Sequence, residues 1–306
     1  MKLKSFAVAL ALLATGAQAA KFTYSENISN RQMNLIDRDL NVLNNLKFKS
    51  EASARTLEVM KLQNLTAQSA SAWLNERVSY IVAEKDVSIK RLLLGLAIYT
   101  ENDFQLYPNP ESNPLNDLNE LMGLTNKTEA VTVMSNIGAG VYMLGKQQSK
   151  LYGLKVSRGL LRKQRKIPIT SPRVGIIQIG EGLFMKQFAI NQNDEAAVPN
   201  SLSRLSTFFH EARHSDGNAQ SLGFAHAICP DNHPLAGNAA CDTNLNGPYT
   251  VGALMTVELA KACDSCTLGE KEELKIRALE EQSRVLPKDK YGKASINLDD
   301  TPEKIK

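Results

Sequence analysis

All four histidines of the chain lie within residues 210–233, and two of them belong to the segment His210-Glu211-Ala212-Arg213-His214. Apolar residues at helical spacing before this segment, Leu202, Leu205 and Phe209, predict an amphipathic helix. Residues four apart on a helix project from the same face, one turn apart. The segment therefore predicts a helix that presents two imidazoles to a single ion, and neutral imidazole is a good zinc ligand.

Glu211 lies directly beside the first of these histidines. In a site of the form H-E-x-x-H, this glutamate does not bind the metal but takes a proton from the metal-bound water. Zinc lowers the pKa of such a water to about 7, so that a carboxylate can activate it at neutral pH. We therefore expect a zinc-dependent hydrolase in which Glu211 is the general base. The alternative is a buried histidine pair that is bonded to backbone carbonyl groups.

The segment His210–His214 resembles the active-site motif of the zincin metallopeptidases. The resemblance implies an α+β fold, in which a mixed sheet packs on the H-E-x-x-H helix, and a peptide or protein as substrate. In zincins a strand whose edge can hold the substrate precedes this helix. Residues Val174–Ile179, bounded by Pro172 and Gly180, predict a strand at a suitable place.

A zinc site of this kind needs a third protein ligand. The metzincin pattern would place a histidine at position 220, where this chain has Gln220. In the gluzincin branch a glutamate from a later helix completes the site, and Glu258 in Glu258-Leu259-Ala260-Lys261-Ala262 matches the E-x-x-x-A form. We therefore expect a gluzincin-like site with Glu258 as third ligand. The main alternative is His226, followed by His233 or Asp242.

Three residue positions suit supporting roles. Asp216 has a carboxylate that can accept the second N–H of a ligand imidazole and fix its tautomer. Tyr249 has a hydroxyl that can donate to the oxyanion formed during hydrolysis, and we count it as a candidate catalytic residue. His226 or His233 can do the same or protonate the leaving amine. A plain structural role is the alternative for each.

The cysteine count is even, which predicts disulfides in an exported protein. Cys229 with Cys241 and Cys263 with Cys266 are the preferred pairs, because the members of each are close in sequence. The rival interpretation is a zinc knuckle formed by the four thiolates.

The N-terminus has the features of a signal peptide. Lys2 and Lys4 precede an apolar run over residues 5–16, and Ala17-Gln18-Ala19 has small residues at the two positions that a signal peptidase recognises. We expect cleavage after Ala19, with Ala20 as the alternative, and a secreted or periplasmic protein. No later segment approaches about twenty consecutive apolar residues, so no stable membrane span is expected in the mature form. The formal charge of +4 is too small to indicate nucleic acid as a partner.

The chain divides into four expected parts. These are a signal peptide (1–19), an N-terminal helical or mixed region (20–115), a zincin-like catalytic domain (116–287) and a polar C-terminal tail (288–306). The loop 107–117, which has three prolines, is the best candidate boundary. Within these parts, the patterns predict helix over 28–72, a strand-rich region over 129–190, and helices over 249–262 and 270–285.

Three functions remain open from the sequence. The first is a zinc metallopeptidase, and the second is a zinc hydrolase of cell-wall peptide amides, which would use the same site. The third is a non-catalytic binding module stabilised by metal and disulfides. Glu211 argues against the third, because a structural zinc site closed by four ligands has no use for a general base.

Overall fold

The computed structural model describes part of the chain, and its described residues are given in the ranges below. The expected signal peptide apart from Ala19, the loop 107–117 and the polar tail lie outside them. The described residues are 19–24, 28–49, 51–78, 80–83, 134–136, 150–151, 167–168, 176–214, 226–237 and 240–286.

Three helices form the N-terminal part, in the range for which the sequence predicts helix. They are α1 (Asn30–Asn45), α2 (Ala54–Met60) and α3 (Ala67–Asn75). Each begins at a hydroxyl side chain, Ser29, Ser53 or Thr66, that accepts a hydrogen bond from the backbone of the first turn. Such caps satisfy N–H groups that have no partner within the helix, and thereby fix where each helix begins.

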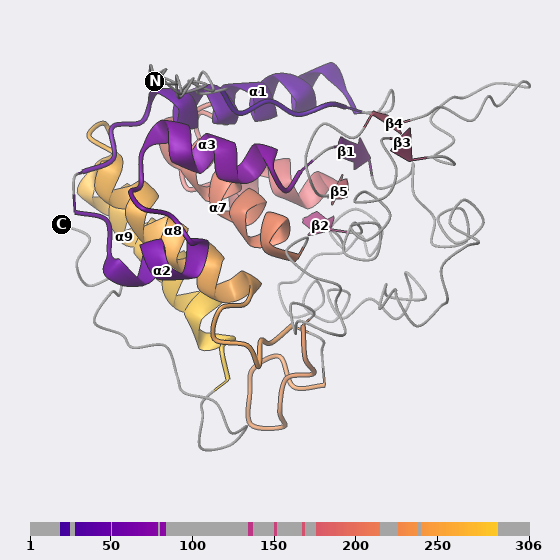
Figure 1. The fold of residues 1–306 in the computed structure, drawn as a ribbon, viewed down its shortest axis with the longest axis vertical. Helices are drawn as coiled ribbons and strands as arrows, with labels where there is room; N and C mark the ends of the chain where they lie inside the picture. Colours follow the sequence, from indigo (N-terminus) through magenta and orange to yellow (C-terminus); the bar gives the residue numbers. More distant parts are fainter. Residues whose placement is uncertain are drawn as a thin grey trace, which may run out of the picture.

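The helix α7 (Val198–His214) is the centre of the described structure. It packs against α1 and α3 from the N-terminal part, and also against α8 (Pro248–Ala262) and α9 (Leu268–Ser283) (Figure 1). The sequence predicts these last two helices to within two residues at each end.

The core that surrounds α7 is continuous between the N-terminal helices and the later ones. Phe208 and Phe209 are fully buried, and their rings lie 5.3 Å and 5.6 Å from those of Phe22 and Trp73. Adjacent positions on a helix face different directions, so two adjacent buried phenylalanines require cover on more than one side of α7. The neighbouring helices and the N-terminal segment that carries Phe22 provide that cover.

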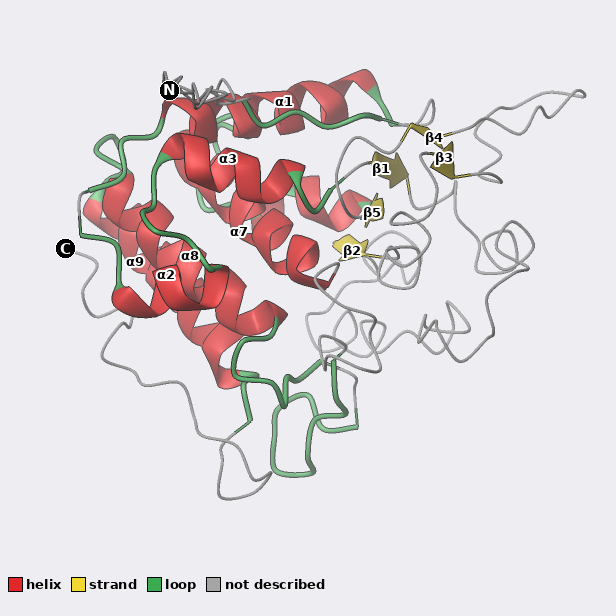
Figure 2. Ribbon diagram, viewed as in Figure 1, coloured by secondary structure: helices red, strands yellow, loops and turns green. Residues whose placement is uncertain are grey.

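The predicted α+β fold class, with a mixed sheet packed on the H-E-x-x-H helix, is wrong for the described residues. Helices make up most of their secondary structure, and strands only a small part. The paired strands are short: β1 (Tyr80–Ala83) runs parallel to β5 (Ile176–Ile179), and β2 (Met134–Asn136) runs antiparallel to β5. The two-residue strands β3 (Lys150–Leu151) and β4 (Ile167–Pro168) form a separate pair. Figure 2 shows the strands at one end of the helices, where they form no layer over α7.

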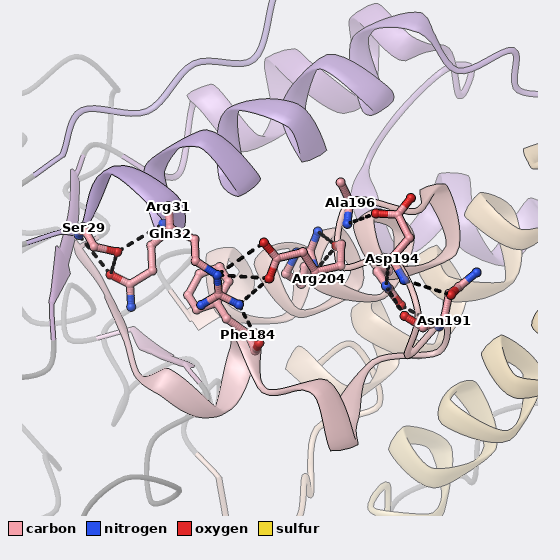
Figure 3. Close-up of polar contacts among 10 residues, drawn as sticks. Ser29, Arg31, Gln32, Phe184, Asn191, Asp194, Ala196 and Arg204 are labelled. Atoms are coloured by element: carbon pink, nitrogen blue, oxygen red, sulfur yellow. Dashed lines mark hydrogen bonds and ion pairs between the residues drawn. The ribbon is translucent and has the colours of Figure 1, made fainter.

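A group of polar contacts, which we call the brace, fixes α7 against α1. Arg204 of α7 donates two hydrogen bonds to the buried carboxylate of Asp39, both at 2.7 Å. Arg31 of α1 pairs with Glu195 and also donates to the carbonyl of Phe184, the last residue of the short 3-10 helix η4 (Glu181–Phe184) before α7 (Figure 3). The brace and the apolar core together determine the direction in which the last turn of α7 points.

The cysteines pair as the sequence predicts. Cys229 is bonded to Cys241, and Cys263 is bonded to Cys266. The first disulfide closes the loop between α7 and α8, and the second lies in the turn between α8 and α9. No helix in the described part is long and apolar enough to cross a bilayer.

Candidate metal centre

The last turn of α7 carries His210 and His214, whose ring centroids are 5.4 Å apart. His210 is 6% exposed, and His214 is partly buried. Their spacing of four residues places both rings on the same face of the helix, as the sequence predicts.

His226 joins this pair from the loop after α7. Its Nε2 lies 3.3 Å from Nε2 of His210, and its ring centroid lies 4.6 Å from that of His214. The candidate ligand atoms of the three histidines all lie within 4.8 Å of one another. A short antiparallel bridge between Ala227 and Cys241, together with the Cys229–Cys241 disulfide, holds the segment that carries His226.

One of the three nitrogen pairs has the spacing that a tetrahedral zinc ion would require. Two nitrogens bound at 2.0–2.1 Å to one such ion are about 3.3–3.4 Å apart. The Nε2 atoms of His210 and His226 are 3.3 Å apart. Burial, together with the nearby His226, His214 and Arg284, holds the pKa of His210 well below its usual value. His210 is therefore in the neutral form that binds metal ions.

Asp242 lies behind His226 and fixes its tautomer. Its Oδ1 is 2.8 Å from Nδ1 of His226. A carboxylate can only accept, so Nδ1 carries the proton, and in neutral imidazole the lone pair is then on Nε2, facing His210. The other oxygen, Oδ2, accepts from the backbone N–H of Tyr249 in the first turn of α8. Asp242 thus supports a ligand, which is the role that the sequence analysis gave to Asp216.

Gly247 is needed for this arrangement. It is the N-cap of α8, and a Cβ atom at this position would lie 2.4 Å from Oδ2 of Asp242. Any side chain would therefore displace the carboxylate from the helix N-terminus. The backbone of Asp242 is itself fixed, because its N–H donates to the carbonyl of Arg284 and its carbonyl accepts from Leu286.

Glu211 is 7% exposed and lies in the same turn of α7 as the histidines. Its Oε2 is 3.9 Å from Nε2 of His214. It is not one of the three converging ligands. This position beside the cluster agrees with the role of a base rather than of a ligand.

The structure does not bring Glu258, the expected third ligand, to the cluster. Glu258 lies nine residues after Tyr249 on α8, which corresponds to about 13 Å along the helix and to its opposite face. Its Oε1 accepts from the backbone N–H of Ser53 at 2.9 Å and from the hydroxyl of Thr56 at 3.2 Å. The carboxylate therefore connects α8 to α2. His226, the alternative in the sequence analysis, is in the position of third ligand.

Tyr249, the other candidate catalytic residue, does lie at the site. Its ring centroid is 4.5 Å from those of both His210 and His226. Its hydroxyl accepts a hydrogen bond from Nη1 of Arg284 at 2.8 Å. The sequence analysis did not identify Arg284, because it lies 35 residues away in a charged helical segment.

The remaining candidates do not enter the cluster. His233 lies close to Cys229 and Cys241, but these sulfurs form a disulfide and cannot act as thiolate ligands. The ring of His233 is engaged with the carbonyl of Ser283 and the backbone N–H of Leu235. Asp216 lies outside the described residues.

Comparisons with protein-family models, with curated protein sequences and with solved structures find no match to this chain.

Proposed function

We propose that the protein is a zinc-dependent hydrolase that cleaves peptide bonds, with His210, His214 and His226 as zinc ligands and Glu211 as the general base. The observation that carries the proposal is the convergence of three imidazoles beside a buried glutamate. Among the described residues, three ligands converge rather than four, which is the pattern of a catalytic site that keeps one position for water or substrate.

His210, His214 and His226 would hold a zinc ion at this place, which would act as a Lewis acid and lower the pKa of the attacking water. Glu211 then accepts the proton of that water, and Tyr249 donates a hydrogen bond to the oxygen that becomes negative when the carbonyl is attacked. Asp242 holds His226 in the correct tautomer throughout. Hydrolysis of cell-wall peptide amides would use the same groups, so substrates of both kinds belong in the assay. The two disulfides support our proposal that the protein works in a secreted or periplasmic location.

The first prediction concerns the base. Glu211→Gln keeps the shape of the side chain but cannot accept the proton, so turnover falls by about 10²–10⁴-fold or more while the zinc content stays near one ion per chain. Elemental analysis gives the metal content, and initial rates on a mixed peptide library give turnover. Glu272→Gln, at an exposed position of α9, is the control and keeps full turnover. Full activity in Glu211→Gln would show that the proposed mechanism is wrong.

The second prediction concerns the third ligand. His226→Ala removes one of three protein ligands and loses stoichiometric zinc, as His210→Ala and His214→Ala do. Glu258→Ala keeps zinc but lowers the free energy of unfolding by about 1–3 kcal/mol, because buried donors of Ser53 and Thr56 lose their acceptor. Zinc retention after dialysis and urea denaturation measure the two effects. If Glu258→Ala loses the metal and His226→Ala keeps it, the ligand set proposed here is wrong.

A further inference from the structure

Arg284 lies next to the candidate metal centre, directly after the last residue of α9. Its Nη1 donates to the hydroxyl of Tyr249 at 2.8 Å, and the ring of Tyr249 contacts both His210 and His226. The positive charge is close enough to contribute to the lowered pKa of His210. Arg284 is therefore separated from the metal ligands by a single side chain.

The charge of Arg284 has no carboxylate at ion-pair distance in the part of the chain that the structure describes. A guanidinium group has five N–H donors, and here one hydrogen bond, to Tyr249, is identified. Burial lowers the pKa of Arg284, but Tyr249 and, to a smaller extent, Glu281 and Glu280 of α9 raise it, so that the pKa is raised overall. Burial raises the pKa of Glu281 to about 8, so this carboxyl is largely protonated and neutral at pH 7.

An arginine that is mostly removed from water is normally balanced by an anion, since burying an uncompensated charge is costly. Arg204 of α7 shows how this chain balances such a charge, with two hydrogen bonds to Asp39. Arg284 has the same fork of donors beside a candidate catalytic centre. The geometry of guanidinium suits bidentate recognition of a carboxylate.

We propose that Arg284 binds a carboxylate of the substrate, so that the site selects peptides with an anionic group close to the scissile bond. This inference rests on the proposed function and names the class of substrate. The carboxylate can be the C-terminus of the peptide or an acidic side chain, and the experiment distinguishes these two sources. Because Arg284 also donates to Tyr249, binding of the anion orders the group that faces the scissile carbonyl.

The test measures binding to the zinc-loaded, full-length mature protein carrying Glu211→Gln, so that turnover does not interfere. Three related peptides are compared by calorimetry. The first has a free C-terminal carboxylate, and the second is its C-terminal amide. The third is the same amide with one residue near its end replaced by aspartate. We expect the free acid or the aspartyl amide to bind at least 10-fold more tightly than the plain amide. The one that does so identifies the source of the carboxylate.

In the Arg284→Gln background, we expect this preference to disappear. Hydrogen bonds to charged groups contribute about 1.5–3 kcal/mol, which corresponds to a loss of about 10–150-fold for the anionic peptide and little change for the plain amide. Arg284→Lys keeps the charge but not the fork, and retains part of the preference. Arg277→Gln is the matched control on α9, because Arg277 donates to Ser203 and to the carbonyl of Phe188, and the preference remains.

An equal loss of affinity for all three peptides in Arg284→Gln would overturn the inference, since it would show that Arg284 only holds Tyr249 in place. The inference would also be overturned if the Glu211→Gln protein that retains Arg284 showed no preference for the anionic peptides, or bound none of the three. A preference for anionic peptides, together with no hydrolysis of any of them by the zinc-loaded protein that retains Glu211, would support Arg284 as the carboxylate site and reject the hydrolase proposal. The two proposals can therefore fail separately.

Discussion

The two ends of α7 carry buried polar groups that are balanced in different ways. At the N-terminal end, Arg204 and Asp39 form two hydrogen bonds of 2.7 Å, and Arg204 also points toward the carbonyl of Glu195. Each charge in this brace has a protein partner, because Arg204 pairs with Asp39 and Arg31 pairs with Glu195. At the C-terminal end, three histidines converge, and Arg284 and Glu281 lie nearby without forming an ion pair with each other.

This difference distinguishes a structural polar group from a candidate binding site. A buried ion pair whose partners are both supplied by the protein is complete, and adding a ligand would only disrupt it. The three converging imidazoles are different, because each neutral ring has a nitrogen lone pair that a cation could use. On this basis, changes in the brace should affect stability and not metal content, whereas changes in the cluster should affect metal content first.

Asp39→Ala should give the largest change in stability. It leaves the guanidinium of Arg204 buried without its partner, and breaking a buried pair in this way costs about 3–5 kcal/mol. The free energy of unfolding from urea denaturation measures the effect, and the folded protein should still bind one zinc ion per chain.

The matched control is the exposed ion pair in the same region. Arg31 and Glu195 are each 50% exposed, and exposed pairs contribute at most about 1 kcal/mol. Glu195→Gln should therefore lower the free energy of unfolding by less than Asp39→Ala. Zinc loss in folded Asp39→Ala, or an equal loss of stability in both variants, would show that the two ends of α7 are not separable in the way we describe.

The sequence was sufficient to predict the local parts of this structure. The spacing of His210 and His214 predicts that both face one side of a helix, and the limits of α8 follow from its apolar pattern and from Pro248. The disulfide pairs are short-range and were also predicted. Each of these features depends on residues that are close together in the chain.

Features that depend on distant contacts could not be predicted in the same way. The apolar residues of α7 show that the helix is buried, but they do not show whether a sheet or other helices cover it. The E-x-x-x-A pattern around Glu258 shows spacing within α8, but not which face of α8 is turned toward α7. The position of His226 is set by the bridge between Ala227 and Cys241, which no local pattern in the sequence indicates.

Glu281 provides the last test of the comparison between the two ends of α7, and its expected effect is smaller. It is a buried carboxyl near the C-terminal end, where the structure shows no ion pair between Glu281 and Arg284. Its Oε2 is buried and has no hydrogen-bond partner in the described structure, and it occupies the space where a Cβ of residue 252 would otherwise lie. Gly252 thus makes room for the carboxyl between α8 and α9. Burial raises the pKa of Glu281 from 4.5 to about 8, although Arg284 and the hydroxyl of Ser206 act in the opposite direction.

The sign of the resulting pH dependence follows from proton binding. Between pH 5 and pH 7 the folded protein keeps the proton on Glu281 while the unfolded chain has released it, so rising pH favours the unfolded chain. The expected loss is about 1.4 kcal/mol per pH unit, or about 2.7 kcal/mol over this interval. The contribution of Glu281 is fully present below pH 4.5 and is lost as pH rises to about 8, the folded-state pKa.

Glu281→Gln keeps the size of the side chain and removes the titrating group. Urea denaturation at pH 5, 6 and 7 should therefore show that the variant gains stability relative to the original protein at each step in pH. The histidines titrate in both proteins, so their effect cancels in the difference between the two curves. Glu280→Gln, at the exposed neighbouring position, should leave the slope unchanged. Parallel stability curves for Glu281→Gln and the original protein would mean that the buried carboxyl is ionised, and that Arg284 already has its anion within the protein.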